Sequence, residues 1–164
     1  FDTLIFATGF AAMTGALLSI DIRGLDGQTL NDKWQEGPKN YLGLTINGFP
    51  NLFTITGPGS PSVLANMIVA IEQHVEWIGN CLFYLRENSL MSIEASKEAE
   101  QTWVSRVNNI SGKTLYTTGC NSWYLGANIP EKPRIFMPFL GYPNYVAECN
   151  RVAEGTYEGF LLSR

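Results

Sequence analysis

A run of glycine, proline and serine, Gly57-Pro58-Gly59-Ser60-Pro61, joins an apolar segment to a long stretch of helix-forming residues. The first turn of such a helix presents backbone N–H groups without partners and the positive end of the helix dipole. These features suit a bound phosphate, or a negative charge that develops on a ligand during a reaction. A turn that only connects a strand to a buried helix has the same sequence, and this structural interpretation is the more common one.

Two further segments could contact a ligand. Thr8 and Gly9 follow an apolar run, and a glycine at the end of a strand lets a ligand or another backbone approach closely. Ordinary turn chemistry explains this glycine equally well. Trp123 lies in a loop rich in Gly and Pro, where an indole can stack on a ligand or donate a hydrogen bond to it. The same indole can instead plug a hydrophobic surface.

The histidine and the cysteines do not predict a catalytic or metal site. His74 is the only histidine and falls in the middle of a predicted helix, so we expect a structural role and not that of a general base. Cys81, Cys120 and Cys149 are widely spaced and form no CxxC pair, so no zinc site is expected. Free thiols are typical of a reducing compartment, which predicts a cytoplasmic location.

Composition narrows the class of protein. Of the 164 residues, 45% are hydrophobic and 16% are charged, which is enough apolar material for a packed core. The formal net charge is −4 and no basic stripe is present, so nucleic-acid binding is not expected. The apolar run Met67–Ile71 is too short to cross a membrane.

The elements that would position these residues are of mixed type, which predicts an α/β fold with a few strands, three main helices and a long ordered loop. Residues 3–7 are apolar enough for a strand buried on both faces of a parallel sheet, whose neighbouring strands would lie upstream. A second strand is predicted at 52–56, and short strands and turns at 15–27. A helix is predicted at 62–88, capped by Ser60 or Ser62, and its first half is apolar almost all round, which implies burial. A second helix is predicted after Ser96, with Glu98 in its first turn and one apolar face formed by Ala99, Trp103, Val107 and Ile110. A third is predicted at 144–154.

Several segments, in this order, resemble the class B flavoprotein monooxygenases and in particular their Baeyer–Villiger branch, such as cyclohexanone, phenylacetone and steroid monooxygenases. The resemblance covers essentially the whole chain. It is carried by Asp2-Thr3-Leu4-Ile5-Phe6-Ala7-Thr8-Gly9-Phe10, Asn51-Leu52-Phe53, Gly57-Pro58-Gly59-Ser60-Pro61, Ile71-Glu72-Gln73-His74-Val75, Trp123-Tyr124-Leu125-Gly126-Ala127-Asn128-Ile129-Pro130, Lys132-Pro133-Arg134-Ile135-Phe136-Met137 and Tyr157-Glu158-Gly159-Phe160.

The resemblance implies that residues 1–164 are the C-terminal portion of the FAD-binding domain in a protein with two Rossmann-like dinucleotide-binding domains. Such a protein binds FAD and NADPH and uses molecular oxygen to convert a ketone into an ester or lactone. The segment of about 117–142 would be the loop that closes over NADP. The implied site residues form two groups: Thr8, Gly9, Asn66, Met67 and Trp123 toward the cofactors, and Ser62, Val63, Leu64 and Met137 in the substrate pocket.

The resemblance also implies that the catalytic residues, the Gly-rich FAD turn and the NADPH domain lie upstream, so this segment would need those missing domains as partners. A related monooxygenase acting on amine nitrogen or sulfide sulfur is an alternative, which an upstream Phe-x-Gly-x-x-x-His-x-x-x-Trp element would exclude. A non-catalytic interaction module is an alternative of another class. That alternative requires a complete reading frame with its own start codon.

Overall fold

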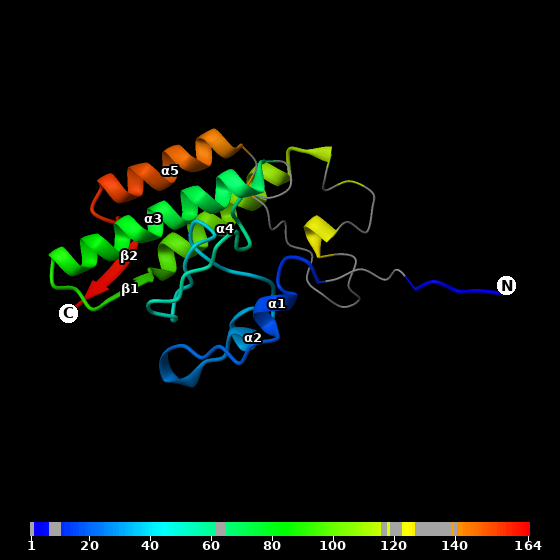
Figure 1. Cartoon of the computed structure of the whole chain (residues 1–164), viewed down its shortest axis with the longest axis horizontal. Coiled ribbons are helices and arrows are strands. Elements are labelled where there is room, and N and C mark those ends of the chain that lie inside the picture. Colours follow the sequence, from blue (N-terminus) through cyan, green and yellow to red (C-terminus); the bar gives the residue numbers. More distant parts are fainter. Residues whose placement is uncertain are drawn as a thin grey trace.

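The computed structural model describes residues 2–6, 11–61, 65–115, 118, 123–126, 139 and 141–164. Its main helices are α3 (Met67–Glu87), α4 (Lys97–Ser111) and α5 (Tyr142–Glu154). The remaining elements are α1 (Gly15–Leu18), η1 (Leu25–Gly27), α2 (Leu30–Lys33), β1 (Ser92–Ala95), η3 (Trp123–Leu125) and β2 (Phe160–Ser163). In Figure 1, α5 lies along α3, the two strands lie near the C-terminus, and α1 and α2 lie to one side of the helical layer.

The three main helices enclose one core, which explains their apolar spacing. Trp103 and Val107 of α4 are buried, and Ala99 and Ile110 pack against the same core, so the predicted apolar face of this helix is confirmed. Facing side chains come from α3 (Trp77, Cys81, Leu85) and from α5 (Tyr145, Cys149, Val152). A second, smaller core joins α2 to the loop before α3 through Leu30, Trp34, Ile46 and Phe49.

The strands β1 and β2 pair antiparallel, with Ser92 opposite Ser163 and Ala95 opposite Phe160. Ile93 and Ala95 face the core while their neighbours are more exposed, as the two-residue period of a strand requires. The sequence analysis did not predict either strand. Four residues are too few for alternation to stand out, and the pairing joins segments far apart in the chain.

The helix predictions are confirmed in existence and corrected in their bounds. Ser96 caps α4 by accepting a hydrogen bond from the Ala99 amide at 3.1 Å, as expected. The prediction that α3 begins at residue 62 with a serine cap is wrong, because Asn66 is the N-cap. The Ser60 hydroxyl donates to the Gly57 carbonyl at 2.6 Å and is therefore not available to cap the helix. The third helix begins at Tyr142, two residues before the predicted start.

The strand predictions are wrong for the described residues. Residues 2–6 form no strand, and Leu4, Ile5 and Phe6 are 67%, 84% and 82% exposed. A strand buried on both faces needs neighbouring strands, and the described residues supply none here. Residues 52–56 contribute only a bridge between Phe53 and Thr45, because the backbone turns into the left-handed region at Asn51 and again at Thr56. Residues 15–27 were predicted as short strands and turns, and they form two short helical elements and a single bridge between Arg23 and Thr29.

The beginning of α3 is less buried than its composition predicts. We expected this apolar half-helix to be covered all round, yet Ile68 is 68% exposed, and Val69, Ile71 and Val75 are also exposed. The core of the described residues covers only one side of α3. Exposed apolar side chains that gather on one helix face are typical of a surface on which a ligand or another part of a protein packs.

Candidate functional site

The turn at residues 57–61 is buried throughout and is held by side chains from two other segments. Asn40 donates through Nδ2 to the Pro58 carbonyl and accepts through Oδ1 from the Gly43 amide at 3.0 Å. The Trp103 indole N–H donates to the Gly59 carbonyl at 3.1 Å. The polar groups of this turn are therefore satisfied inside the protein, which gives the segment before α3 a fixed shape.

Two glycines of this turn are required by its geometry. Gly59 has a φ of +83°, and a Cβ added there would lie 3.0 Å from Asn40 Oδ1. A Cβ added at Gly57 would lie 2.5 Å from Thr54 Oγ1, which itself donates to the Gly43 carbonyl at 2.9 Å. The Gly-Pro-Gly pattern is thus explained by close packing inside the chain, as the structural interpretation proposed.

Beyond this turn, the N-terminus of α3 has the features expected for a ligand site. Asn66 is exposed, and its side-chain oxygen accepts from the amides of Ile68 at 3.1 Å and Val69 at 3.4 Å. Met67 is half-buried beside it. The helix dipole therefore ends at an accessible surface bordered by the exposed apolar side chains of Ile68 and Val69.

The other predicted site residues are only partly described. Trp123 begins η3 and is half-buried against the main core, with its ring stacked on Tyr124 at a centroid distance of 4.2 Å. Thr8, Gly9 and Met137 lie outside the described residues, and so do the consecutive residues 62–64, that is Ser62, Val63 and Leu64. Three of the nine predicted residues are described, and of these three the structure brings together the sequence neighbours Asn66 and Met67.

His74 is structural, as the sequence analysis expected. It is fully buried, its Nδ1 accepts from the Thr56 amide at 3.0 Å, and its Nε2 lies 2.8 Å from the Tyr145 hydroxyl. Because Nδ1 accepts a backbone N–H, the proton of the neutral ring sits on Nε2. Burial lowers the pKa of His74 to about 4, since a buried imidazolium would lose its hydration.

We expect the free energy of unfolding to fall by about 2 kcal/mol between pH 7 and pH 5 through His74. The ring has a pKa of about 4 when folded and 6.5 when unfolded, so the unfolded chain binds the proton first as the pH falls. The stability that the neutral His74 ring contributes is fully present above pH 6.5 and is lost as the pH falls toward 4. Urea denaturation at pH 7, 6 and 5 measures it, with His74→Asn as the variant that cannot titrate. Equal pH slopes for both chains would contradict the expectation.

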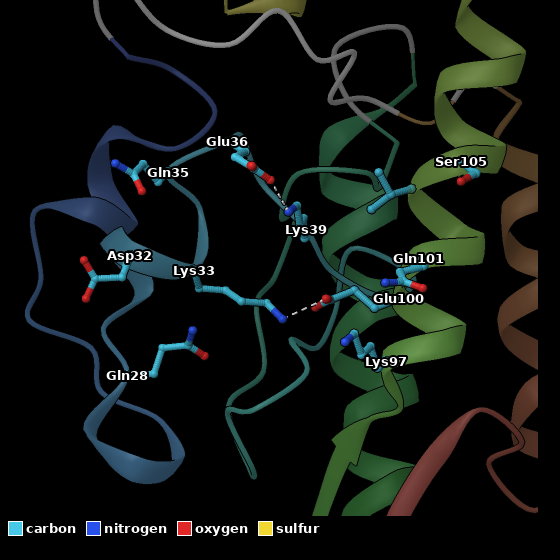
Figure 2. Close-up of a pocket in the computed structure, with 11 residues that line it drawn as sticks. Gln28, Asp32, Lys33, Gln35, Glu36, Lys39, Lys97, Glu100, Gln101 and Ser105 are labelled. Atoms are coloured by element: carbon cyan, nitrogen blue, oxygen red, sulfur yellow. Dashed lines mark hydrogen bonds and ion pairs between the residues drawn. The ribbon is translucent and has the colours of Figure 1, made fainter.

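A separate cleft of about 690 Å³ lies between α2 with its following loop and α4 (Figure 2). Its charged lining consists of Lys33, Lys39 and Lys97 together with Asp32, Glu36 and Glu100. None of the described residues predicted for the site lines it. The equal numbers of acidic and basic groups give the cleft no net preference for an anion or a cation.

The cleft contains a buried ion pair that the sequence analysis missed. Lys33 Nζ lies 2.9 Å from Glu100 Oε2, and the two side chains are 14% and 3% exposed. Glu100 Oε1 also accepts from the Asn47 amide at 2.9 Å. The pair fastens α2 to α4, as the dashed line in Figure 2 shows. A lysine and a glutamate this far apart in sequence give no local signal of their pairing.

The described residues offer no group of three or more side chains able to hold a metal ion. Within the same part of the chain, no helix is long and apolar enough to cross a membrane.

Comparison with known proteins places this arrangement in a family. No protein-family model matches the chain. It is 42% identical over 163 residues to cyclohexanone 1,2-monooxygenase from an Acinetobacter species, across 97% of this chain and 29% of the relative. It is 38% identical over 162 residues to phenazine N-monooxygenase from Lysobacter antibioticus, across 98% of this chain and 29% of that protein.

Solved structures agree with these relatives. Cyclohexanone monooxygenase from Rhodococcus sp. Phi1, bound to NADP+, matches with a TM-score of 0.91 and 39% identity over 96% of this chain and 29% of its own. A monooxygenase called OTEMO, in complex with FAD and NADP, matches with a TM-score of 0.87 and 38% identity, again over 96% of this chain and 29% of its own.

The chain therefore has the α/β fold of a segment from a flavoprotein with two dinucleotide-binding domains. It is similar to a C-terminal segment of the Baeyer–Villiger type of flavoprotein monooxygenase, as its sequence motifs predicted. It spans about 30% of the length of the curated relatives that it matches.

Proposed function

We propose that residues 1–164 form the C-terminal portion of the FAD-binding domain of a monooxygenase that converts a ketone into an ester or lactone. The whole protein would use FAD, NADPH and molecular oxygen. The similarity to cyclohexanone 1,2-monooxygenase over 97% of the chain carries this proposal. The activity belongs to the whole protein, and we assign no catalytic residue to this segment.

The N-terminus of α3 fits a flavin in chemistry and exposure. Asn66 caps the helix, whose dipole gives this end a positive electrostatic potential that would stabilise negative charge on a reduced isoalloxazine ring. The exposed apolar side chains of Ile68 and Val69 offer contact to a flat ring and exclude water from it. When bound, FAD would supply the oxygen-activating chemistry. Asn66 and Met67 would position it.

The remaining proposed contacts rest on the resemblance. Ser62, Val63, Leu64 and Met137 would line the substrate pocket. Thr8 and Gly9 would lie where the chain returns from the NADPH domain, and Trp123 would lie on the loop of about 117–142 and contact the NADP ribose. The half-exposed position of Trp123 supports this role, because a ring closed into the core could not reach a ligand.

N-oxygenation is the second candidate function, because a phenazine N-monooxygenase is 38% identical to nearly the whole chain. The segment is thus similar both to ketone monooxygenases and to an enzyme that oxygenates nitrogen. We favour the ketone, because the cyclohexanone 1,2-monooxygenase shares the higher identity of 42%. A cytoplasmic location is part of the proposal, and the free thiols of Cys81 and Cys149 support it.

We expect the isolated chain to purify colourless and to bind no FAD tightly, because its sequence has no Gly-rich dinucleotide-binding turn. The same chain should yield a yellow, FAD-containing protein when it replaces the matching segment of the Acinetobacter cyclohexanone 1,2-monooxygenase. Absorbance at the flavin band after gel filtration measures the FAD content of the isolated chain and of the hybrid. A stoichiometric flavin on the isolated chain, or a folded but colourless hybrid, would count against the proposed function.

A further inference from the structure

A buried hydrogen-bond relay links four segments behind the α3 N-terminus. The Thr56 amide donates to His74 Nδ1, and His74 Nε2 lies 2.8 Å from the Tyr145 hydroxyl, which donates to the Leu42 carbonyl at 2.8 Å. The ring has one proton, on Nε2, so every donor in the relay meets one acceptor. His74 and Tyr145 are both fully buried.

The ends of this relay are backbone positions that need support. Thr56 has a φ of 54° and Leu42 a φ of 58°, in the left-handed region that is costly for residues other than glycine. Thr56 directly precedes the turn at residues 57–61, and the loop of Leu42 packs on that turn through Gly43 and Ser60. The relay therefore holds two strained turns against each other.

The bond between Thr56 and His74 also ties α3 to the backbone beside the buried turn. Thr56 directly precedes the turn at residues 57–61, and His74 lies on α3 about two helical turns after Asn66 and Met67. Segments that are tied together have less conformational freedom than segments that move independently. Tyr145, on α5, fixes the tied point to the third main helix.

We propose that His74 and Tyr145 are positioning residues, which fasten α3 to the backbone at Thr56 and so hold the N-terminus of α3 in place for the cofactor. The part about the cofactor rests on the proposed function. The link between Thr56 and α3 is a property of this chain and is tested without a flavin.

The first test measures hydrogen exchange of backbone amides in the 164-residue chain by NMR. Tyr145→Phe removes the hydroxyl but keeps the ring contacts with Trp103 and Phe139, and His74→Leu removes both ring nitrogens. We expect exchange at Thr56 to rise about five- to tenfold in both variants relative to Val107 in α4. His74→Asn should restore the protection of Thr56, because its side-chain oxygen can replace Nδ1. Unchanged exchange at Thr56, or an equal rise at Val107, would overturn the proposed link between Thr56 and α3.

The second test uses the FAD-containing hybrid with the Acinetobacter relative. We expect Tyr145→Phe to weaken FAD binding about five- to tenfold in a hybrid that melts at a lower temperature but stays folded under the conditions of the binding assay. If Thr56 loses protection in the chain but FAD affinity and the flavin spectrum of the hybrid are unchanged, the link exists and does not serve the cofactor, which overturns the proposal. A hybrid with the unaltered chain that binds no FAD overturns the proposed function and leaves the result of the first test intact.

Discussion

Glu100→Ala is expected to lower the free energy of unfolding by about 3 to 5 kcal/mol, because it leaves a partly buried lysine without its counter-charge. Glu100 is 3% exposed, and its partner Lys33 is 14% exposed. The substitution also removes the acceptor of the Asn47 amide. Both losses occur where α2 and α4 meet, so the small core around Leu30 and Trp34 should loosen first.

Two matched variants separate the charge from the packing. Glu100→Gln keeps an acceptor for the Asn47 amide and removes only the charge, so it should cost less than the alanine variant. Lys39→Ala breaks an exposed ion pair with Glu36 in the same cleft and should lower the free energy of unfolding far less than Glu100→Ala does. Urea denaturation at pH 7 compares them. If Glu100→Ala costs no more than Lys39→Ala, the ion pair does not fasten the two helices.

Trp123→Ala, in the hybrid with the Acinetobacter relative, is expected to reduce NADPH-dependent oxygenation by about 5- to 150-fold. This is the loss of one hydrogen bond that is worth about 1 to 3 kcal/mol in the transition state. The free energy of unfolding should fall by less than it does when a fully buried tryptophan is truncated, because Trp123 is only half-buried and stacks on its neighbour Tyr124.

Trp103→Ala provides the structural counterpart in the same protein. Trp103 is 2% exposed, stacks on Phe139 at 5.0 Å and donates to the Gly59 carbonyl. Its truncation should cost about 3 to 5 kcal/mol of stability. Melting temperature and turnover are measured on both variants. If Trp123→Ala melts like Trp103→Ala while its folded fraction keeps normal turnover, Trp123 is a core plug and not a cofactor contact.

Local signals predicted the helices well. Ser96 followed by Glu98 located the start of α4, and the spacing of Trp103 and Val107 located its buried face. The start of α3 could not be predicted, because Ser60, Ser62 and Asn66 are all good capping residues. The packing of Ser60 into the preceding turn decides among them, and this packing depends on residues far away in sequence.

The candidate site was predicted chiefly from the resemblance, because its chemistry is spread over weak local motifs. Asn66 and Met67 carry no signal of their own beyond their place at a helix start. The ion pair of Lys33 with Glu100 and the relay of His74 with Tyr145 were not predicted, since each joins residues that only the fold brings together. The exposure of Leu4, Ile5 and Phe6 was not predicted because apolar sequence alone does not say which surface will cover it.

Product analysis of the hybrid enzyme tests the central claim most directly. The hybrid contains this chain in place of the matching segment of the Acinetobacter cyclohexanone 1,2-monooxygenase, and it is given NADPH, oxygen and either cyclohexanone or phenazine. We predict formation of the lactone from cyclohexanone, with NADPH consumed in proportion to product. A hybrid that binds FAD and oxidises NADPH but forms no lactone, or that forms only phenazine N-oxide, would contradict the assignment of this segment to a ketone-oxygenating enzyme.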